Sequence, residues 1–268
     1  DKNFVWFQGV VEDRNDPLKL GRCRVRCVGF HTDNKDQLPP EDLPWAHPIT
    51  PITSAAMNGI GQAPVGPVEG TWVVGFFRDG EDAQQPVIMG TLGGIPQEEA
   101  DTSFGFSDPI GKYPKSDFIG EADTNRLARN ENTENTIVQT KKDDMDVMDI
   151  ATGIGSQDIV SEPDVPYAAQ YPFNKVYESE SGHIIEVDDT EGSERINIHH
   201  KSGTFIEIHP DGTMVRKVVG TNHEVRAGDE GIHVIGTYNI TVEGNANIYT
   251  LGYSHTKTVG LHSLEVLG

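Results

Sequence analysis

Apolar and polar residues alternate with a fixed phase along the C-terminal part of the chain, in units of eight residues. Each unit closes with glycine, at Gly212, Gly220, Gly228, Gly236, Gly244, Gly252, Gly260 and Gly268. Most positions four and two residues before these glycines are apolar: Ile232, Val234, Ile240, Val242, Ile248, Leu264 and Val266. This order predicts a short strand with one buried face, followed by a turn that glycine permits.

Such short strands cannot enclose a core by themselves. An eight-residue unit leaves about five residues for the strand, a reach of roughly 17 Å, which is too short to wind round a packed interior. Several copies of the chain around one axis solve this problem, and three copies form the smallest closed prism, without an exposed sheet edge. The alternative is a flexible Gly-rich tail, which would not keep Ile and Val in phase. Thr250, Thr256, Thr258 and Arg226 interrupt the apolar stripe.

The N-terminal region, residues 1–112, has the pattern of a small all-β barrel. Short apolar runs are separated by turn signals such as Asp79-Gly80 and Gly93-Gly94. The predicted strands are Trp6–Val11, Gly21–Phe30, Gly70–Phe77 and Pro86–Leu92. A long excursion rich in Pro and Gly, residues 31–66, interrupts them, and loops of that length usually carry function or dock on a partner.

The rest of the chain divides into two parts. Residues 113–175 are acidic and polar and predict an extended linker strapped over other surfaces, with one short helix at 124–128 capped by Asp123. Residues 176–268 return to the β pattern, first as a meander and then as the eight-residue units. Turn residues at 189–192, 201–203 and 210–212 separate alternating runs that contain Ile196, Ile198, Ile206 and Ile208.

Composition narrows the classes of function. The formal net charge of -21 repels phosphate backbones, so nucleic acid is not an expected partner. No apolar run approaches about 18 residues, and residues 1–4 do not resemble the start of a secretory signal. The two cysteines, Cys23 and Cys27, alternate with arginines on one predicted strand. They lie too far apart on a strand to form a disulfide, so we expect buried, inert thiols, as in a protein made in a reducing cytoplasm.

Three clusters of polar residues have possible chemistry. Five acids crowd around His183 and Arg195, either as a metal or acid/base site or as a solvated hairpin turn with charge pairs between chains, and we favour the turn: Glu186, Asp188, Asp189, Glu191 and Glu194. The histidines of the meander can gather around a threefold axis to bind metal, but alternation with Ile198 and Ile208 places the first and last on the outward face: His199, His200 and His209.

The third cluster is the arginines of the cysteine strand: Arg22, Arg24 and Arg26. On a barrel they suggest oligonucleotide binding, but no aromatic residues interleave them. We expect them to face outward and pair with an acidic partner surface. The sequence therefore predicts no catalytic, cofactor-binding or metal-binding residues.

Several motifs follow one another in a fixed order along the chain: Val10-Val11-Glu12-Asp13-Arg14, Asp16-Pro17-Leu18-Lys19-Leu20-Gly21-Arg22, Leu43-Pro44-Trp45, residues 52–57, residues 66–70, residues 106–109, Glu180-Ser181-Gly182-His183 and Val242-Glu243-Gly244-Asn245. In this order they resemble the central spike, or tail-associated lysozyme, family of contractile-tailed bacteriophages. The valine-glycine-repeat spike of type VI secretion shares the second half of this pattern. The resemblance implies an N-terminal OB-type barrel, a homotrimer and a C-terminal intertwined triple-stranded β-helix.

One feature departs from the family. The phage lysozyme carries a helical hydrolase domain between the barrel and the β-helix, whereas residues 113–175 here are too few and too polar for one. We therefore expect a structural, non-enzymatic spike of the tail baseplate that punctures the host outer membrane mechanically. A secretion spike, a spike with residual cell-wall hydrolase activity and an OB-type nucleic-acid binder are the alternatives.

The resemblance also implies partners and a location. The barrel would dock on a ring of hub proteins, and a tip protein would cap the spike after Gly268. The protein would be synthesised in the host cytoplasm and would end in the virion, at the centre of the baseplate.

Overall fold

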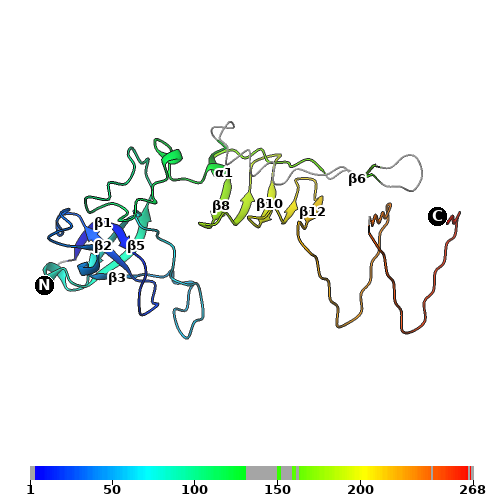
Figure 1. The fold of residues 1–268 in the computed structure, drawn as a ribbon, viewed down its shortest axis with the longest axis horizontal. Coiled ribbons are helices and arrows are strands. Elements are labelled where there is room, and N and C mark those ends of the chain that lie inside the picture. Colours follow the sequence, from blue (N-terminus) through cyan, green and yellow to red (C-terminus); the bar gives the residue numbers. More distant parts are fainter. Residues whose placement is uncertain are drawn as a thin grey trace.

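The computed structural model describes residues 4–130, 150–151, 159–160, 163–242, 244–264 and 266. A β-barrel, a five-stranded sheet and an extended C-terminal segment follow one another along the long axis of the molecule (Figure 1). The predicted all-β class is confirmed, because the single α-helix in these ranges has four residues. None of the helices described there is long and apolar enough to cross a membrane.

The N-terminal barrel confirms the prediction for this region. Its closed order is β1-β2-β3-β5-β4, and all neighbours are antiparallel except β3 and β5. The strands are β1 (Val5–Asp13), β2 (Cys23–Cys27), β3 (Trp45–Pro48), β4 (Trp72–Phe77) and β5 (Pro86–Leu92). Strand β3 lies in the excursion 31–66, which we had predicted to be loop.

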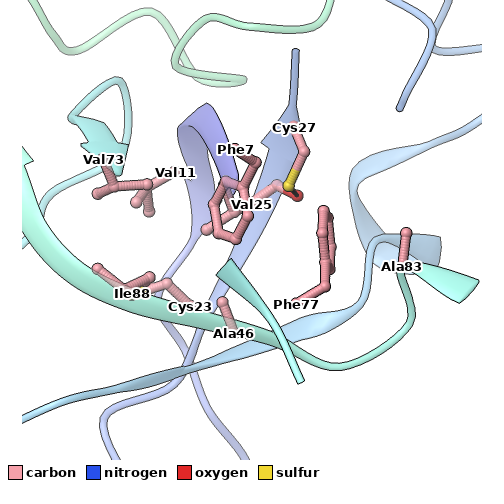
Figure 2. Packing of buried hydrophobic residues seen from close by; sticks show 10 residues of the cluster. All are labelled: Phe7, Val11, Cys23, Val25, Cys27, Ala46, Val73, Phe77, Ala83 and Ile88. Atoms are coloured by element: carbon pink, nitrogen blue, oxygen red, sulfur yellow. Dashed lines mark hydrogen bonds between the residues drawn. The ribbon is translucent and has the colours of Figure 1, made fainter. Parts of the chain in front are cut away.

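Alternate side chains of these strands fill the barrel. Phe7, Val25 and Phe77 point toward one another there, and Cys23 and Cys27 lie in the same cluster as free, buried thiols (Figure 2). The two cysteines therefore face inward, as predicted. Gly75 permits the close approach of β4 and β5, since a Cβ at this position would lie 1.8 Å from the carbonyl oxygen of Val87.

Short helices mark the turns between strands. They are η1 (Pro40–Asp42), η2 (Gly80–Asp82), η3 (Ser116–Phe118) and α1 (Arg126–Arg129). The cap predicted for α1 was wrong: Asn125, not Asp123, accepts the hydrogen bond from the amide of Leu127. Asp123 instead accepts a hydrogen bond from the amide of Gly94, because the chain passes back over the end of β5.

The predicted meander is present as a sheet with the order β12-β11-β10-β9-β8, every pair antiparallel. Its strands are β8 (Asn174–Glu178), β9 (Ile184–Asp188), β10 (Arg195–His199), β11 (Phe205–Ile208) and β12 (Met214–Lys217). A separate pair joins β6 (Ile150–Ala151) and β7 (Ile159–Val160).

Beyond β12 the chain runs in extended stretches separated by bends. The bends fall at 219–220, 227–228, 235–236, 244, 251–252 and 259–260, so they coincide with the eight-residue glycine repeat. The described residues from 218 onward form no strand pairs within the single chain. The pairing between copies of the chain stays a prediction.

Candidate subunit interface

The five-stranded sheet β8–β12 exposes its apolar face. Alternation within each strand directs most isoleucines and valines to one side of the sheet, and the charged residues together with Ile184 and Phe205 to the other. The exposed fractions of the apolar side chains range from 40% to 53%, for Ile185, Val187, Ile196, Ile198 and Ile206. An apolar sheet face open to water is unusual in a soluble monomer and marks an interaction surface.

The strand register makes this face continuous. Ile198 of β10 lies opposite Ile185 of β9 and Ile206 of β11. Ile196 lies in the same way between Val187 and Ile208. Side chains directly opposite each other on neighbouring antiparallel strands contact each other, so the two rows form one apolar surface across β9, β10 and β11. We call this surface the isoleucine face.

The opposite face buries charges. Arg195 lies at its centre, with its Nη2 atom 2.8 Å from Oε2 of Glu186 and its Nε atom 2.5 Å from Oε2 of Glu207. Asn197 and Asn174 each donate a hydrogen bond to Glu186, at 2.9 Å and 3.0 Å. Burial opposes the charge on the guanidinium, but the two carboxylates outweigh it and raise the pKa of Arg195.

These contacts correct the prediction of a solvated hairpin turn. Glu186, Asp188 and Arg195 are buried, and only Asp189, Glu191 and Glu194 lie in an exposed turn, between β9 and β10. Glu186 has its oxygens occupied by donors from Arg195 and two asparagines. Within the described part of the chain, Glu186 therefore has a structural role as the hydrogen-bond acceptor for these side chains.

A strap covers the charged face; we define it as α1 together with residues 163–173. The hydroxyl of Tyr167 donates a 2.7 Å hydrogen bond to the carbonyl of Leu127, and its ring lies 5.2 Å from the guanidinium of Arg195. Burial, followed by the charge of Glu186, raises the pKa of Tyr167. Leu127, Tyr167, Ala169 and Ile184 form a small apolar cluster there. The strap therefore keeps water from the charges of the sheet.

The predicted histidine cluster does not form within the chain. His199 does lie opposite the isoleucine face, but it is only 1% exposed, with its ring stacked at 6.2 Å on Phe205. His209 binds Glu207 at 2.9 Å, and His200 stands at the other end of the strands beside His183, with ring centroids 4.5 Å apart. No group of three or more metal-ligating side chains occurs among the described residues.

The residues predicted to form the trimer core are exposed in the single chain. Their exposed fractions lie between 47% and 96%: Ile232, Val234, Ile240, Val242, Ile248, Leu264 and Val266. The predicted turn glycines lie at the bends, where an added Cβ would meet no atom within 4 Å: Gly220, Gly228, Gly236, Gly244, Gly252 and Gly260. The apolar residues of the repeat are thus exposed in the single chain, as are those of the isoleucine face that precedes them in sequence.

The three arginines in and directly before β2 behave differently from the prediction. Arg26 is fully buried, and its Nε atom lies 2.6 Å from Oε1 of the equally buried Glu12. Arg22 pairs with Asp16 at 2.7 Å, and the guanidinium groups of Arg22 and Arg24 lie 5.3 Å and 4.4 Å from the ring of Trp45. These arginines therefore pair with acids and an aromatic ring of their own chain. Sequence reasoning missed the contact of Trp45 with these arginines, because β3 is distant from β2 in sequence.

Comparison with known families decides the relationship of the chain. The family described as "Gp5 N-terminal OB domain" matches residues 29–173, more than half of the chain. The chain belongs to the Gp5 family. The closed barrel is thus of the OB type, and the resemblance to the central spike proteins of contractile-tailed phages is confirmed.

Two relatives of this Gp5-family chain indicate how much of it is shared. Protein Gp5 of Vibrio phage KVP40 (isolate Vibrio parahaemolyticus/Japan/Matsuzaki/1991) is 46% identical over 274 residues, covering 92% of this chain and 65% of the relative. The pre-baseplate central spike protein Gp5 of Enterobacteria phage T4 is 53% identical over 118 residues, covering 42% of this chain and 20% of the relative. The chain therefore spans less than two thirds of the length of each relative.

A charged junction joins the barrel side of the Gp5-family chain to the sheet. Glu180, in the turn between β8 and β9, accepts hydrogen bonds from Arg14 at 2.8 Å, from the hydroxyl of Tyr113 at 2.6 Å and from Lys112 at 3.1 Å. These donors, Arg14 first, lower the pKa of Glu180 to about 2. Sequence reasoning missed this junction, because no local pattern links residues so far apart.

Proposed function

We propose that this chain is the structural, non-enzymatic central spike of a contractile phage tail baseplate, and that three copies form the spike. The name of the T4 relative, a pre-baseplate central spike protein, supports the location. Within the spike, residues 1–112 act as the OB-type barrel, 113–175 as a linker and 176–268 as the shaft. The spike is part of the virion and is synthesised in the host cytoplasm.

The exposed isoleucine face carries this proposal. A single chain leaves Ile196, Ile198 and Ile206 in water while it covers the charged face with the strap. Burying one such side chain completely stabilises a protein by about 1.5–3 kcal/mol, so this face favours association. Three sheets arranged around an axis bury all three isoleucine faces in one core and leave the straps outside.

The eight-residue repeat extends this core. In each unit the apolar residues, such as Ile240 and Val242, turn toward the axis, and the glycine turn leads the chain to the next side of the prism. The chains then wind around one another, and each strand pairs on both sides. A shaft of this kind carries axial load without bond-breaking chemistry, because bending or separating one chain would break the pairing of all three.

The two ends of the long molecule suggest which proteins the spike would bind. The barrel lies at one end of the long molecule, where a ring of hub proteins would hold it, and the repeat lies at the other end (Figure 1). A tip protein would cap that end. Contraction of the tail would drive the shaft through the host outer membrane. Nucleic acid is not among the proposed partners, because the chain carries a formal net charge of -21.

Light scattering on the purified chain tests the assembly. We expect about three times the chain mass of 29.3 kDa. Ile198→Asp should prevent association, since three carboxylates would be buried together, whereas Lys115→Asp on the exposed surface should not. A monomer of the unmodified chain at micromolar concentration would refute the proposal. A zymogram on host peptidoglycan should show no lysis; a clearing zone from pure protein would contradict the non-enzymatic role.

A further inference from the structure

The hairpin turns of the sheet β8–β12 lie along two sides of the sheet, where the strands end, and these two sides differ in charge. Each of these sides is called an edge below. The turns at 179–183 and 200–204 lie on one edge, and the turns at 189–194 and 209–213 lie on the other. The turn at 200–204 carries Lys201 and no acid, whereas the turn at 189–194 carries Asp189, Glu191 and Glu194. We call these two edges the basic edge and the acidic edge.

The charges at the two turns are available for a partner. Asp189 pairs with Lys175 of its own sheet. Glu191, Glu194 and Lys201 are exposed, and none of them has an ion pair within the described part of the chain. Of the acids near the basic edge, Glu180 is engaged by Arg14, Tyr113 and Lys112, and Glu178 accepts a hydrogen bond from Asn125. The remaining charges of the two edges are therefore opposite in sign.

Closure around an axis brings these edges together. In a ring with cyclic symmetry each contact is between one edge of a copy and the opposite edge of the next, at the same height. The acidic turn lies between β9 and β10, and the basic turn lies between β10 and β11. The two turns thus differ in height by one strand spacing, about 4.8 Å, which a lysine side chain can span.

We propose that Lys201 of each copy pairs with Glu191 and Glu194 of the next copy, at every corner of the prism. The inference rests on the proposed trimer and adds the direction in which its copies follow one another. The same order repeats farther along the sheet, where Asp211 lies on the acidic edge and Lys217 ends β12 at the basic edge. Charge complementarity at such rims mainly guides the encounter of subunits and fixes their register.

Engineered cysteines test the contact directly. Lys201→Cys and Glu191→Cys in the same chain lie at opposite ends of β10, so they cannot form a disulfide within one sheet. A short bismaleimide, which bridges the gap that the Lys201 side chain spans in the proposed pair, should join the copies into a covalent trimer on a denaturing gel. Each single variant should stay uncross-linked, and the native Cys23 and Cys27 are buried.

The outcomes separate this inference from the trimer itself. Dimers formed by Lys201→Cys alone would overturn the inference, because two basic edges would then meet. An uncross-linked double variant that still has the mass of a trimer in light scattering would overturn the pairing and leave the trimer standing. A monomeric unmodified chain would overturn both.

Charge reversal adds a kinetic test. Lys201→Glu should slow assembly from the urea-unfolded chain about tenfold at low salt, as should Glu191→Lys with Glu194→Lys. All three substitutions together should restore the rate, because the charges are then exchanged between the edges. Lys115→Glu, on the exposed surface before η3, is the matched control and should leave the rate unchanged. Equal rates for all variants would contradict the inference.

Discussion

Arg14, near the end of β1, and Glu180, in the turn between β8 and β9, form two hydrogen bonds of 2.8 Å and 3.1 Å. Their positions are 166 residues apart in sequence. The same carboxylate also binds Tyr113 and Lys112, which follow the barrel, so one side chain connects β1, the segment after β5 and the sheet. This contact aligns the barrel with the proposed shaft.

Glu180→Gln should loosen this junction and leave the barrel and the sheet folded. The pKa of Glu180 is lowered from 4.5 to about 2 in the folded protein. Its contribution is therefore complete above about pH 4.5 and is lost as the pH falls toward 2, where the folded carboxylate becomes protonated. The protection factors of the amides in residues 179–183, which are corrected for the pH dependence of intrinsic exchange, should fall in the variant at pH 7 and in the unmodified protein near pH 2. Glu98→Gln, at an exposed site, should change nothing; unchanged exchange in Glu180→Gln would contradict the role.

Arg26→Met should strongly destabilise the barrel. The guanidinium of Arg26 binds Glu12 and the carbonyls of Thr32 and Leu38, so its loss leaves a buried carboxylate without its cation. Breaking one side of such a pair costs about 3–5 kcal/mol. Urea unfolding followed by tryptophan fluorescence should show a lower midpoint.

Two further variants sharpen this test. Arg26→Met combined with Glu12→Leu should recover part of the loss, because no unpaired charge then remains. Arg78→Met, at an exposed position after β4, should leave the midpoint almost unchanged. Equal midpoints for Arg26→Met and Arg78→Met would mean that the buried pair contributes nothing.

The two cysteines should resist thiol reagents in the native protein. Burial raises the pKa of Cys23 to about 11 and the pKa of Cys27 to about 12. Both thiols therefore stay protonated from pH 7 to pH 9, and the thiolate is the reactive form. An aromatic disulfide reagent at pH 8 should modify neither residue until denaturant is added, after which both should react. Rapid reaction in buffer alone would show that the barrel opens.

In the eight-residue units, an acidic substitution should prevent trimer assembly only where it replaces a residue of the apolar face. Ile240→Asp or Ile248→Asp would bury three like charges in the proposed core, which the shaft cannot accommodate. Asn239→Asp and Asn247→Asp, on the alternate face, should assemble normally. Light scattering measures both pairs. Equal effects at both sets of positions would show that the predicted strand phase is wrong.

Much of the fold was predictable because it depends on local patterns. Alternation identified the meander and four of the five barrel strands, all except β3, and the repeat of glycine identified the bends beyond residue 218. Alternation also separated Ile198 from His199 correctly. It could not show that His199 would be the buried residue of the two, because alternation assigns each side chain to a face but not what covers that face.

The same limit explains the other errors. Arg26 was expected to face solvent, since it alternates with inward cysteines on β2. It does lie outside the barrel core, but residues 32–38 and Phe106 cover it and Glu12. Glu186 and Arg195 are covered in a similar way by Tyr167. A strand pattern assigns a side chain to a face of the sheet, whereas its burial depends on what long-range segments lie over that face.

The isoleucine face has a consequence for the supply of spikes in an infected cell. In the proposed trimer, a chain that leaves this surface in water until two more copies arrive depends on the concentration of further copies of the same chain, since association adds to its stability. While most chains are still free, the equilibrium amount of a trimer follows the cube of their concentration, so halving synthesis lowers it about eightfold. The number of finished tails would then respond steeply to the dosage of this one gene.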